Sequence, residues 1–204
     1  MGEGSGVRWA RHYLERGFPD RYTPLLGMFA QLETRLAGGS VARVHQVACC
    51  SGREVAHFAK RFPHVAFTGS DADDSIVAFL RETWRDVPNL GFSRLRLEET
   101  DGAEMESLRG DLVYASGGLH YMDPPSLQRF FRRARGLAGA LLLSQPLDRG
   151  YLVAEERVSR PRRQLSWNHP YPHYLRESGW TRIGWSEGFA EELPDVKNVS
   201  AAAD

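Results

Sequence analysis

The fold of this chain is decided by the stretch VHQVACCSG, which occupies residues 44–52. Its first part, Val44 to Ala48, predicts a short strand, and the small residues after it predict a turn. The apolar spacing that follows Gly52 predicts a helix over Arg53–Arg61. Small side chains in such a turn let a ligand lie against the backbone, where N–H groups at the helix start act as donors. The stretch therefore predicts a ligand-binding turn between a strand and a helix.

Strands and helices alternate along the rest of the central sequence. Further strands are predicted at 65–68, 90–97, 112–115 and 140–144, and helices at 74–84 and 125–137. Strands that alternate with helices of about 10–12 residues are typical of βαβ units and of a parallel sheet. We therefore expect an α/β fold, with a doubly wound, mainly parallel sheet and helices on both faces. Ligands bind such sheets at the carboxyl ends of the strands, near the point where the strand order reverses.

The N-terminal part of the chain has a helical pattern. Apolar residues at three- and four-residue steps from Tyr22 to Leu36 predict an amphipathic helix, which ends at Gly38-Gly39. We interpret residues 1–40 as an N-terminal helical cap and residues 41–204 as the α/β domain, the two forming one compact unit.

The C-terminal part contains a segment of different character. Residues 148–164 are polar and rich in arginine, and we expect them to form an insertion or a lid over the ligand edge. A solvated surface loop is the alternative. A last helix is predicted at 171–178 and a last strand at 180–185, whereas the residues after Glu191 carry little signal.

Composition excludes several classes of protein. Lys and Arg together number 26, as do Asp and Glu, so the formal net charge is zero, which argues against a dedicated nucleic-acid binder. The longest apolar stretch, at 137–143, is far below the ~18 residues that span a bilayer, and residues 1–6 lack the apolar core of a signal peptide. The two cysteines, Cys49 and Cys50, are adjacent and would rarely pair. We expect a reduced, cytoplasmic chain that contacts no membrane.

An acidic residue follows the second predicted strand. Asp71 lies nineteen residues beyond Gly52, and an acid at that distance can accept both hydroxyls of a ribose. With this pair of features the sequence resembles the class I S-adenosylmethionine-dependent methyltransferases. That family has a Gly-hydrophobic-Asp at the end of its second strand, which is present here as Thr68-Gly69-Ser70-Asp71.

The family's other motif is present in altered form. It consists of an acid, a hydrophobic residue and Gly-x-Gly-x-Gly; here Gln46 stands at the acidic position and only the last glycine, Gly52, is kept. An acid at position 46 would hold the ammonium group of the cofactor, and Gln46 hydrogen-bonds without a charge. Ala48 replaces the first glycine, which is tolerable if its φ is negative. Cys50 replaces the second glycine, close to where the methionine part of the cofactor would lie.

The resemblance continues to about Gln145. The segment 101–104, Asp-Gly-Ala-Glu, resembles the family's Asp-Ala-Glu, which contacts adenine, and Leu119-His120-Tyr121 resembles a turn near the transferred methyl group. Residues 41–204 would then bind S-adenosylmethionine and release S-adenosylhomocysteine. The implied cofactor contacts are Gln46, Ala48, Cys49, Cys50, Gly52, Asp71, Ala72, Gly102, Ala103 and Ser116.

Two histidines are candidate bases. Methyl transfer needs a base only if the acceptor must lose a proton, as a phenol or an alcohol must. His120, in the turn after the fourth strand, is the first candidate, with a structural contact as the alternative role. His169 is the second, with an ordinary capping or surface role as its alternative.

Aromatic residues are candidates for the substrate site. They gather early and late in the chain, in regions that cover the active site in the resembled family, and an aromatic pocket suits an apolar or aromatic small molecule. Core packing is the other use for such residues. The candidate substrate contacts are Tyr13, Tyr22, Tyr121, Trp167 and Tyr171.

Three further features have two interpretations each. His169 and His173 have a spacing that zinc ligands on a helix could have, but intervening prolines and the lack of a third ligand lead us to predict no metal. Cys49 and Cys50 could be reactive thiols, although small apolar residues in a tight turn explain them better. The arginines of 157–163 and of the 125–137 helix could contact RNA, whereas solvated faces explain them more simply.

These observations favour an S-adenosylmethionine-dependent methyltransferase that acts on a small molecule, in specialised metabolism. One alternative is a methyltransferase-like protein that keeps the cofactor site but catalyses a cyclisation or rearrangement, or only binds. Another is an RNA-modifying enzyme or an inactive partner subunit. The oligomeric state is left open by the sequence.

Overall fold

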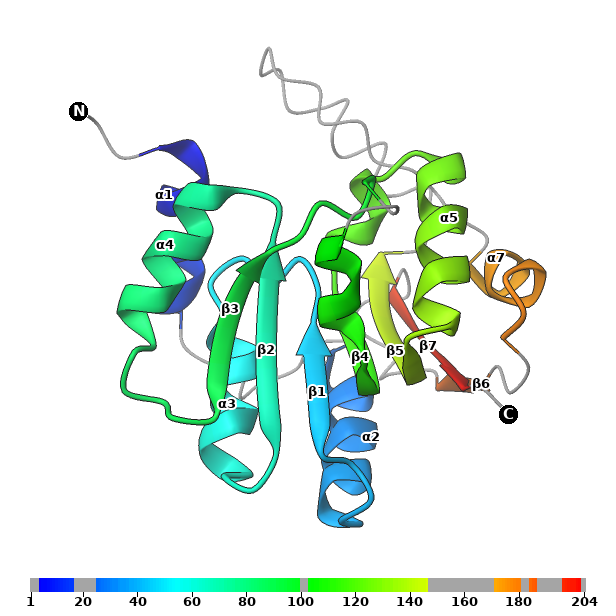
Figure 1. Ribbon diagram of the computed structural model, residues 1–204, viewed down its shortest axis with the longest axis horizontal. Helices are drawn as coiled ribbons and strands as arrows, with labels where there is room; N and C mark the ends of the chain where they lie inside the picture. Colours follow the sequence, from blue (N-terminus) through cyan, green and yellow to red (C-terminus); the bar gives the residue numbers. More distant parts are fainter. Residues whose placement is uncertain are drawn as a thin grey trace.

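The computed structural model describes residues 4–16, 25–99, 103–146, 171–180, 184–186 and 196–202. A seven-stranded sheet lies at its centre, with the strand order β3-β2-β1-β4-β5-β7-β6 (Figure 1). Its strands are β1 (Arg43–Gln46), β2 (Ala66–Asp71), β3 (Leu90–Arg94), β4 (Gly110–Ser116), β5 (Ala138–Pro146), β6 (Gly184–Ser186) and β7 (Val196–Ala202).

The first five strands are parallel to one another. β1 pairs with β2 and with β4, β2 pairs with β3, and β4 pairs with β5, all in parallel register. The chain runs outward from β1 to β3 and then returns to the other side of β1, so the strand order reverses between β1 and β4. This arrangement confirms the expected doubly wound sheet, and it makes the carboxyl ends of β1 and β4 the place where a ligand is expected.

Two apolar layers cover the two faces of the sheet. Alternate residues of a strand point to opposite faces. Accordingly Leu112 and Tyr114 of β4 belong to one cluster, which also contains residues from the helices at 25–37, 53–61 and 74–83. Val113 and Ala115 belong to the other, which also contains residues from the helices at 103–108, 124–135 and 171–177. Figure 1 shows α2 (Leu25–Ala37) and α3 (Arg53–Arg61) behind the sheet and α5 (Pro124–Arg135) in front of it. The other described helices are α1 (Ser5–Glu15), α4 (Asp74–Thr83) and α7 (Tyr171–Glu177), with the 3-10 turns η1 (Ala103–Leu108) and η2 (Leu119–Tyr121).

The C-terminal strands differ from the sequence-based prediction. The last predicted strand began at Trp180, which lies outside any strand; among the described residues β6 is Gly184–Ser186, and β7 follows in the tail that carried little signal. The Trp180 side chain is buried in the core, where its indole N–H donates to the Phe131 carbonyl at 3.1 Å. β7 pairs antiparallel with both β5 and β6, so the sheet is mainly rather than wholly parallel.

The N-terminal helices pack on the α/β core. α1 lies against α4, and α2 lies against β5 and β7. Among the described residues, no helix is both long enough and apolar enough to span a membrane.

Candidate functional site

The turn after β1 has the backbone shape of a glycine-rich loop. Ala48, Cys50 and Gly52 have φ values of 51°, 48° and 64°, in the left-handed region that favours glycine. The condition under which alanine would be tolerated at position 48, a negative φ, is therefore not met. The turn is held by two backbone bonds, from Cys49 N–H to the Ser70 carbonyl at 2.9 Å and from Gly52 N–H to the Cys49 carbonyl at 2.8 Å. These bonds fix the same alternating conformation that three glycines would adopt freely.

The turn after β4 leaves room for Ala48. A Cβ atom added to Gly118 would lie 2.6 Å from the Cβ of Ala48, far inside the contact distance of two carbon atoms. The φ of Gly118 is 85°, so the backbone there also favours glycine. The methyl group that Ala48 adds to the first turn is therefore matched by a missing side chain in the second.

Asp71 faces the first turn from the end of β2. Its Oδ2 accepts a hydrogen bond from Cys50 N–H at 3.1 Å, and its Oδ1 accepts one from Asp73 N–H at 3.2 Å. Burial raises the pKa of Asp71, while these backbone donors lower it. The two sequence motifs thus meet at the carboxyl edge of neighbouring strands, with a half-buried carboxyl group that can accept ribose hydroxyls.

A buried carboxyl group that the sequence analysis missed lies beneath the turn. Glu54, in the first turn of α3, is only 8% exposed. The Gln46 side-chain amide donates to its Oε2 at 2.6 Å, and the Ser116 hydroxyl at the end of β4 donates to the same oxygen. Gln46 also donates to the Ser116 hydroxyl at 3.0 Å, which closes a triangle of three side chains. Burial raises the pKa of Glu54, and its hydrogen bonds oppose this shift.

The amide of Gln46 is fixed from its other side as well. Its Oε1 accepts from the Val55 N–H at 3.2 Å and from the Tyr114 hydroxyl at 3.1 Å. These two donors determine which end of the amide is oxygen, so the nitrogen must point at Glu54. The signal available in the sequence was an acid two residues after Gly52, in the first turn of the helix that follows the strand position without an acid.

His120 lies beside the switch point of the sheet. It belongs to η2, which follows β4, and its side chain is 5% exposed. Its ring lies over that of Tyr121, with 3.9 Å between centroids, and Tyr121 is 41% exposed. The structure therefore places one candidate base and one candidate substrate contact together after β4.

The candidate aromatic contacts divide between the site and the core. Tyr13 lies next to the start of α3, because the Arg53 guanidinium donates to its carbonyl at 2.8 Å and lies 5.5 Å from its ring centre. Tyr171, in contrast, is fully buried in the core, with its ring centre 6.3 Å from that of Phe131. The assignment of Tyr171 to the substrate site is corrected accordingly: it lies on the buried face of α7, together with Leu175 one turn later.

Two further predicted cofactor contacts are exposed to solvent. Ala72 directly follows β2, and Ala103 is the first residue of η1. Several predicted features lie outside the described residues: Gly102, Tyr22, Trp167, His169 and the segment 148–164.

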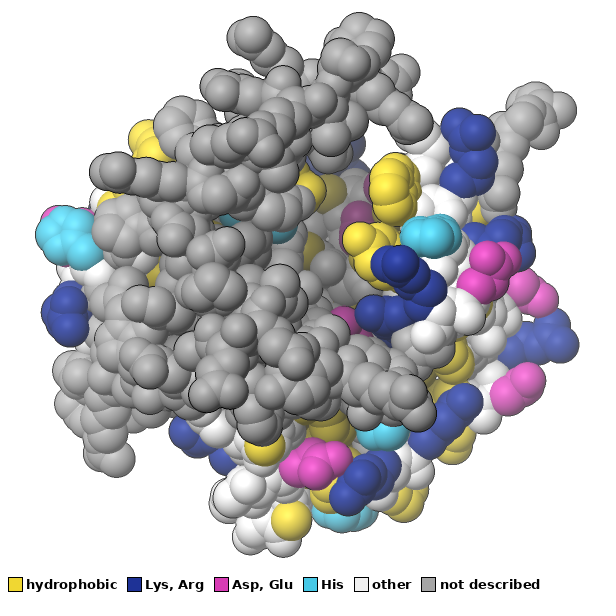
Figure 2. All heavy atoms as spheres, turned by 180° about the vertical axis from the view of Figure 1, so that it is seen from behind, with side chains coloured by type: hydrophobic (Ala, Val, Ile, Leu, Met, Phe, Trp, Pro, Cys, Tyr) yellow, Lys and Arg dark blue, Asp and Glu magenta, His cyan; other side chains and the backbone are white. Residues whose placement is uncertain are grey.

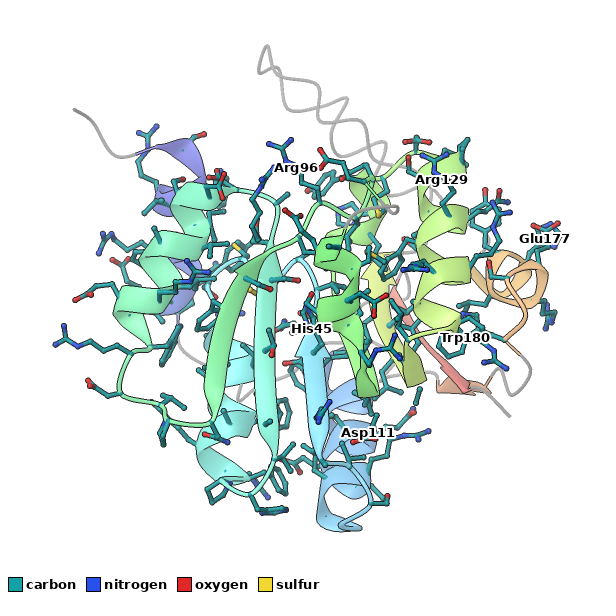
Figure 3. The ribbon with its side chains drawn as sticks, viewed as in Figure 1. His45, Arg96, Asp111, Arg129, Glu177 and Trp180 are labelled. Carbon is teal, nitrogen blue, oxygen red and sulfur yellow. The ribbon has the colours of Figure 1, made fainter. Side chains whose placement is uncertain are left out.

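His45 is a buried histidine with a defined structural role. It lies near the middle of the sheet (Figure 3), where Nδ1 is 3.1 Å from the Ser107 carbonyl and Nε2 is 2.8 Å from the Ser70 hydroxyl. A carbonyl oxygen only accepts, so Nδ1 carries the proton and Nε2 accepts from Ser70. Burial lowers the pKa of His45 to about 4.

Comparison with known proteins identifies the domain that carries this site. Residues 46–140 match a family described as a methyltransferase domain. Residues 46–140 are a methyltransferase domain of the class I S-adenosylmethionine-dependent type. This confirms the resemblance found in the sequence, and the matched segment contains both turns and Asp71.

Solved structures share the fold of this methyltransferase domain. The CMeT domain of the citrinin polyketide synthase is 18% identical, with a TM-score of 0.64; the match covers 81% of this chain and 47% of that one. An O-methyltransferase family protein from Burkholderia thailandensis is 16% identical, with a TM-score of 0.60 and coverages of 88% and 57%. The N-terminal domain of EvdMO1, solved with S-adenosylhomocysteine bound, is 15% identical, with a TM-score of 0.62 and coverages of 90% and 82%. This chain thus spans about half the length of the first two, and no curated protein matches its sequence significantly.

The two thiols of the methyltransferase domain are both free. Burial raises the pKa of Cys50 to about 11 and raises that of Cys49 as well. Both thiols are therefore protonated at neutral pH, which makes them poor nucleophiles and favours a packing role. Among the described residues, no group of three or more His, Cys, Asp or Glu side chains could hold a metal ion.

The described part of the face drawn in Figure 2 gives little support to RNA binding. In the coloured part of Figure 2, Lys and Arg side chains are interspersed with Asp and Glu side chains. On α5, Arg133 pairs with Glu106 at 2.9 Å and Arg135 donates to the Gly179 carbonyl at 3.0 Å. The arginines of 157–163 lie outside the described residues.

Proposed function

We propose that this domain transfers the methyl group of S-adenosylmethionine to a small molecule. The observation that carries the proposal is the meeting of the left-handed turn at 48–52 with the carboxyl group of Asp71, at the switch point of a methyltransferase fold. The chain spans about half the length of two of the similar structures. Its substrate and its biological context are therefore also part of this proposal. We place the reaction in the cytoplasm and in specialised metabolism.

The residues of the site fit this cofactor. Asp71 presents a half-buried carboxyl group for the ribose hydroxyls, and the turn at 48–52 offers backbone N–H groups where side chains are small. When bound, S-adenosylmethionine supplies an activated methyl group on a positively charged sulfur. The chain's own part is to orient the acceptor, to exclude water and to take up a proton where the acceptor has one to lose. We assign that last role to His120.

A small acceptor is favoured by the aromatic side chains at the edge of the site. Tyr13 and Tyr121 are both exposed. Tyr13 lies beside α3, the helix that follows the cofactor turn, and Tyr121 lies just after β4, the strand next to β1. Aromatic rings at such an edge suit an apolar or aromatic molecule. The similarity to the CMeT domain of the citrinin polyketide synthase is consistent with a natural-product substrate.

Calorimetric titration with S-adenosylmethionine and S-adenosylhomocysteine tests the proposal, followed by a methyl-transfer assay against a panel of small phenols, alcohols, amines and acidic carbon compounds. Binding of both ligands and transfer to at least one acceptor is the expected result. Absence of binding would refute the function.

Binding without transfer would favour a second function, in which the cofactor site serves a rearrangement or binding alone. That alternative is supported by the replacement of two motif glycines by Ala48 and Cys50.

A further inference from the structure

The acidic position of the methyltransferase motif is occupied by Gln46, yet a carboxyl group lies within hydrogen-bonding distance of it. The Glu54 side chain reaches back from α3 so that its Oε2 lies 2.6 Å from the Gln46 amide nitrogen. The same oxygen accepts from the Ser116 hydroxyl, at the end of β4. An acidic oxygen is therefore present at the strand position, although it comes from the following helix.

The setting of Glu54 is unusual for a structural acid. A buried carboxylate is costly unless it is paired with a positive charge or fully hydrogen-bonded. Among the described residues, no Lys, Arg or His side chain forms an ion pair with Glu54, and its hydrogen-bond donors, Gln46 and Ser116, are neutral. The neighbouring Arg53 lowers the pKa of Glu54 through its charge, but its guanidinium bonds to the Tyr13 carbonyl. A carboxyl group held in this way is suited to a cation that arrives with a ligand.

We propose that Glu54 provides the negative charge that holds the ammonium group of the cofactor's methionine part, in place of a strand acid at position 46. This inference rests on the proposed function, because it assumes that the site binds S-adenosylmethionine. Gln46 acts as a positioning residue: its amide is fixed by Val55 and Tyr114, and its nitrogen holds the Glu54 carboxyl group at the end of β1. Ser116 fixes the same carboxyl group from the end of β4.

The test compares two ligands, of which only one carries the group at issue. S-adenosylhomocysteine has an amino-acid part with an ammonium and a carboxylate group, whereas 5′-methylthioadenosine has the same adenosyl and sulfur parts but a methyl group in place of the amino-acid part. Glu54→Gln keeps the shape of the side chain and removes its charge. We expect this variant to bind S-adenosylhomocysteine about ten- to a hundred-fold more weakly, the scale for losing a hydrogen bond to a charged group. Its affinity for 5′-methylthioadenosine should change by less than about two-fold.

Two further variants separate this role from a structural one. The double variant Gln46→Glu/Glu54→Gln returns the acid to the strand and should recover most of the lost affinity. Glu82→Gln removes an exposed acid of α4, 75% exposed, and should leave both affinities unchanged. Thermal unfolding without ligand is expected to give Glu54→Gln a midpoint equal to or above that of the parent, since the variant removes a buried charge.

Each outcome bears on the inference. Equal weakening of both ligands in Glu54→Gln, or a clear drop in its unliganded midpoint, would assign Glu54 a structural role and overturn the proposal. Unchanged affinity for S-adenosylhomocysteine would overturn it too, while the proposed function would stand. If the parent itself bound neither S-adenosylmethionine nor S-adenosylhomocysteine, the proposed function would fail and the inference with it.

Discussion

Replacing Ala48 and Cys50 by glycine is expected to stabilise the unliganded protein. Both residues have φ near +50°, where the Cβ atom of a non-glycine residue crowds the backbone at a cost of about 1–2 kcal/mol. Glycine escapes that cost but loses roughly 0.5–1 kcal/mol more backbone entropy on folding than alanine does. The net gain should be about 0.5–1 kcal/mol for each change, and roughly 1–2 kcal/mol for the double variant.

Thermal unfolding measures this gain directly. For a domain of this size, 1 kcal/mol corresponds to about 2–4 °C in the midpoint, so the double variant should melt about 2–8 °C higher. Ser51→Gly is the matched control, because Ser51 lies between the two positions and its φ is not positive. It should lower the midpoint, since only the entropy cost applies there. Cys50→Gly should also bind S-adenosylhomocysteine at least as tightly as the parent, because it removes a side chain near the ligand.

A drop in the midpoint of both Ala48→Gly and Cys50→Gly, similar to that of Ser51→Gly, would refute the reasoning from backbone conformation. The side chains of Ala48 and Cys50 would then make contacts worth more than the strain that they impose. A loss of affinity in Cys50→Gly alone would show that its thiol contacts the ligand favourably.

Three further predictions concern the acid and the two histidines. Asp71→Ala should weaken binding of S-adenosylhomocysteine by about 1.5–3 kcal/mol in calorimetry, and it should also lower the unliganded midpoint, because the N–H groups of Cys50 and Asp73 lose their acceptor; equal affinity would remove Asp71 from the site. With a hydroxyl acceptor, His120→Ala and His120→Gln should each lower the transfer rate roughly 10²–10⁴-fold at constant cofactor affinity, and a small loss in both would leave His120 a positioning role only. His45 is neutral in the folded protein, with its pKa lowered to about 4 by burial, whereas the unfolded chain takes up a proton near pH 6.5. Stability should therefore fall by about 3 kcal/mol as the pH drops from 6.5 to 4, and denaturant titrations should show a smaller fall in His45→Asn; equal falls would contradict this account.

The parallel core could be predicted because its signals are local. Buried strands such as β5 are short apolar runs bounded by turn residues, and α3 begins and ends where its apolar spacing does. β7 escaped prediction because it is defined by pairing with β5 and β6 rather than by its own pattern. The aromatic side chain of Trp180 suggested a strand, but in the structure this side chain packs in the core with residues of α5.

The site was predictable to the extent that it depends on the backbone of two motifs. The turn at 48–52 and Asp71 are recognisable from spacing alone, and the structure brings them into contact. Glu54 could not be assigned in this way, because its role depends on which side chains of β1 and β4 lie against α3. Tyr171 was misassigned for the opposite reason: an aromatic residue in a suggestive region packs in the core when its helix turns it inward.

At two positions where this chain departs from the methyltransferase motif, a residue that is close in space but not adjacent in sequence compensates for the change. The methyl group of Ala48 faces Gly118, where any side chain would collide with it. The missing acid at Gln46 faces Glu54, whose carboxyl oxygen takes the place of the strand carboxylate. Packing alone requires the space opposite Ala48, with or without a cofactor. A buried acid beside Gln46 is different, because it is costly and forms no ion pair among the described residues. The buried acid therefore favours a cofactor site that has been rebuilt over one that has decayed.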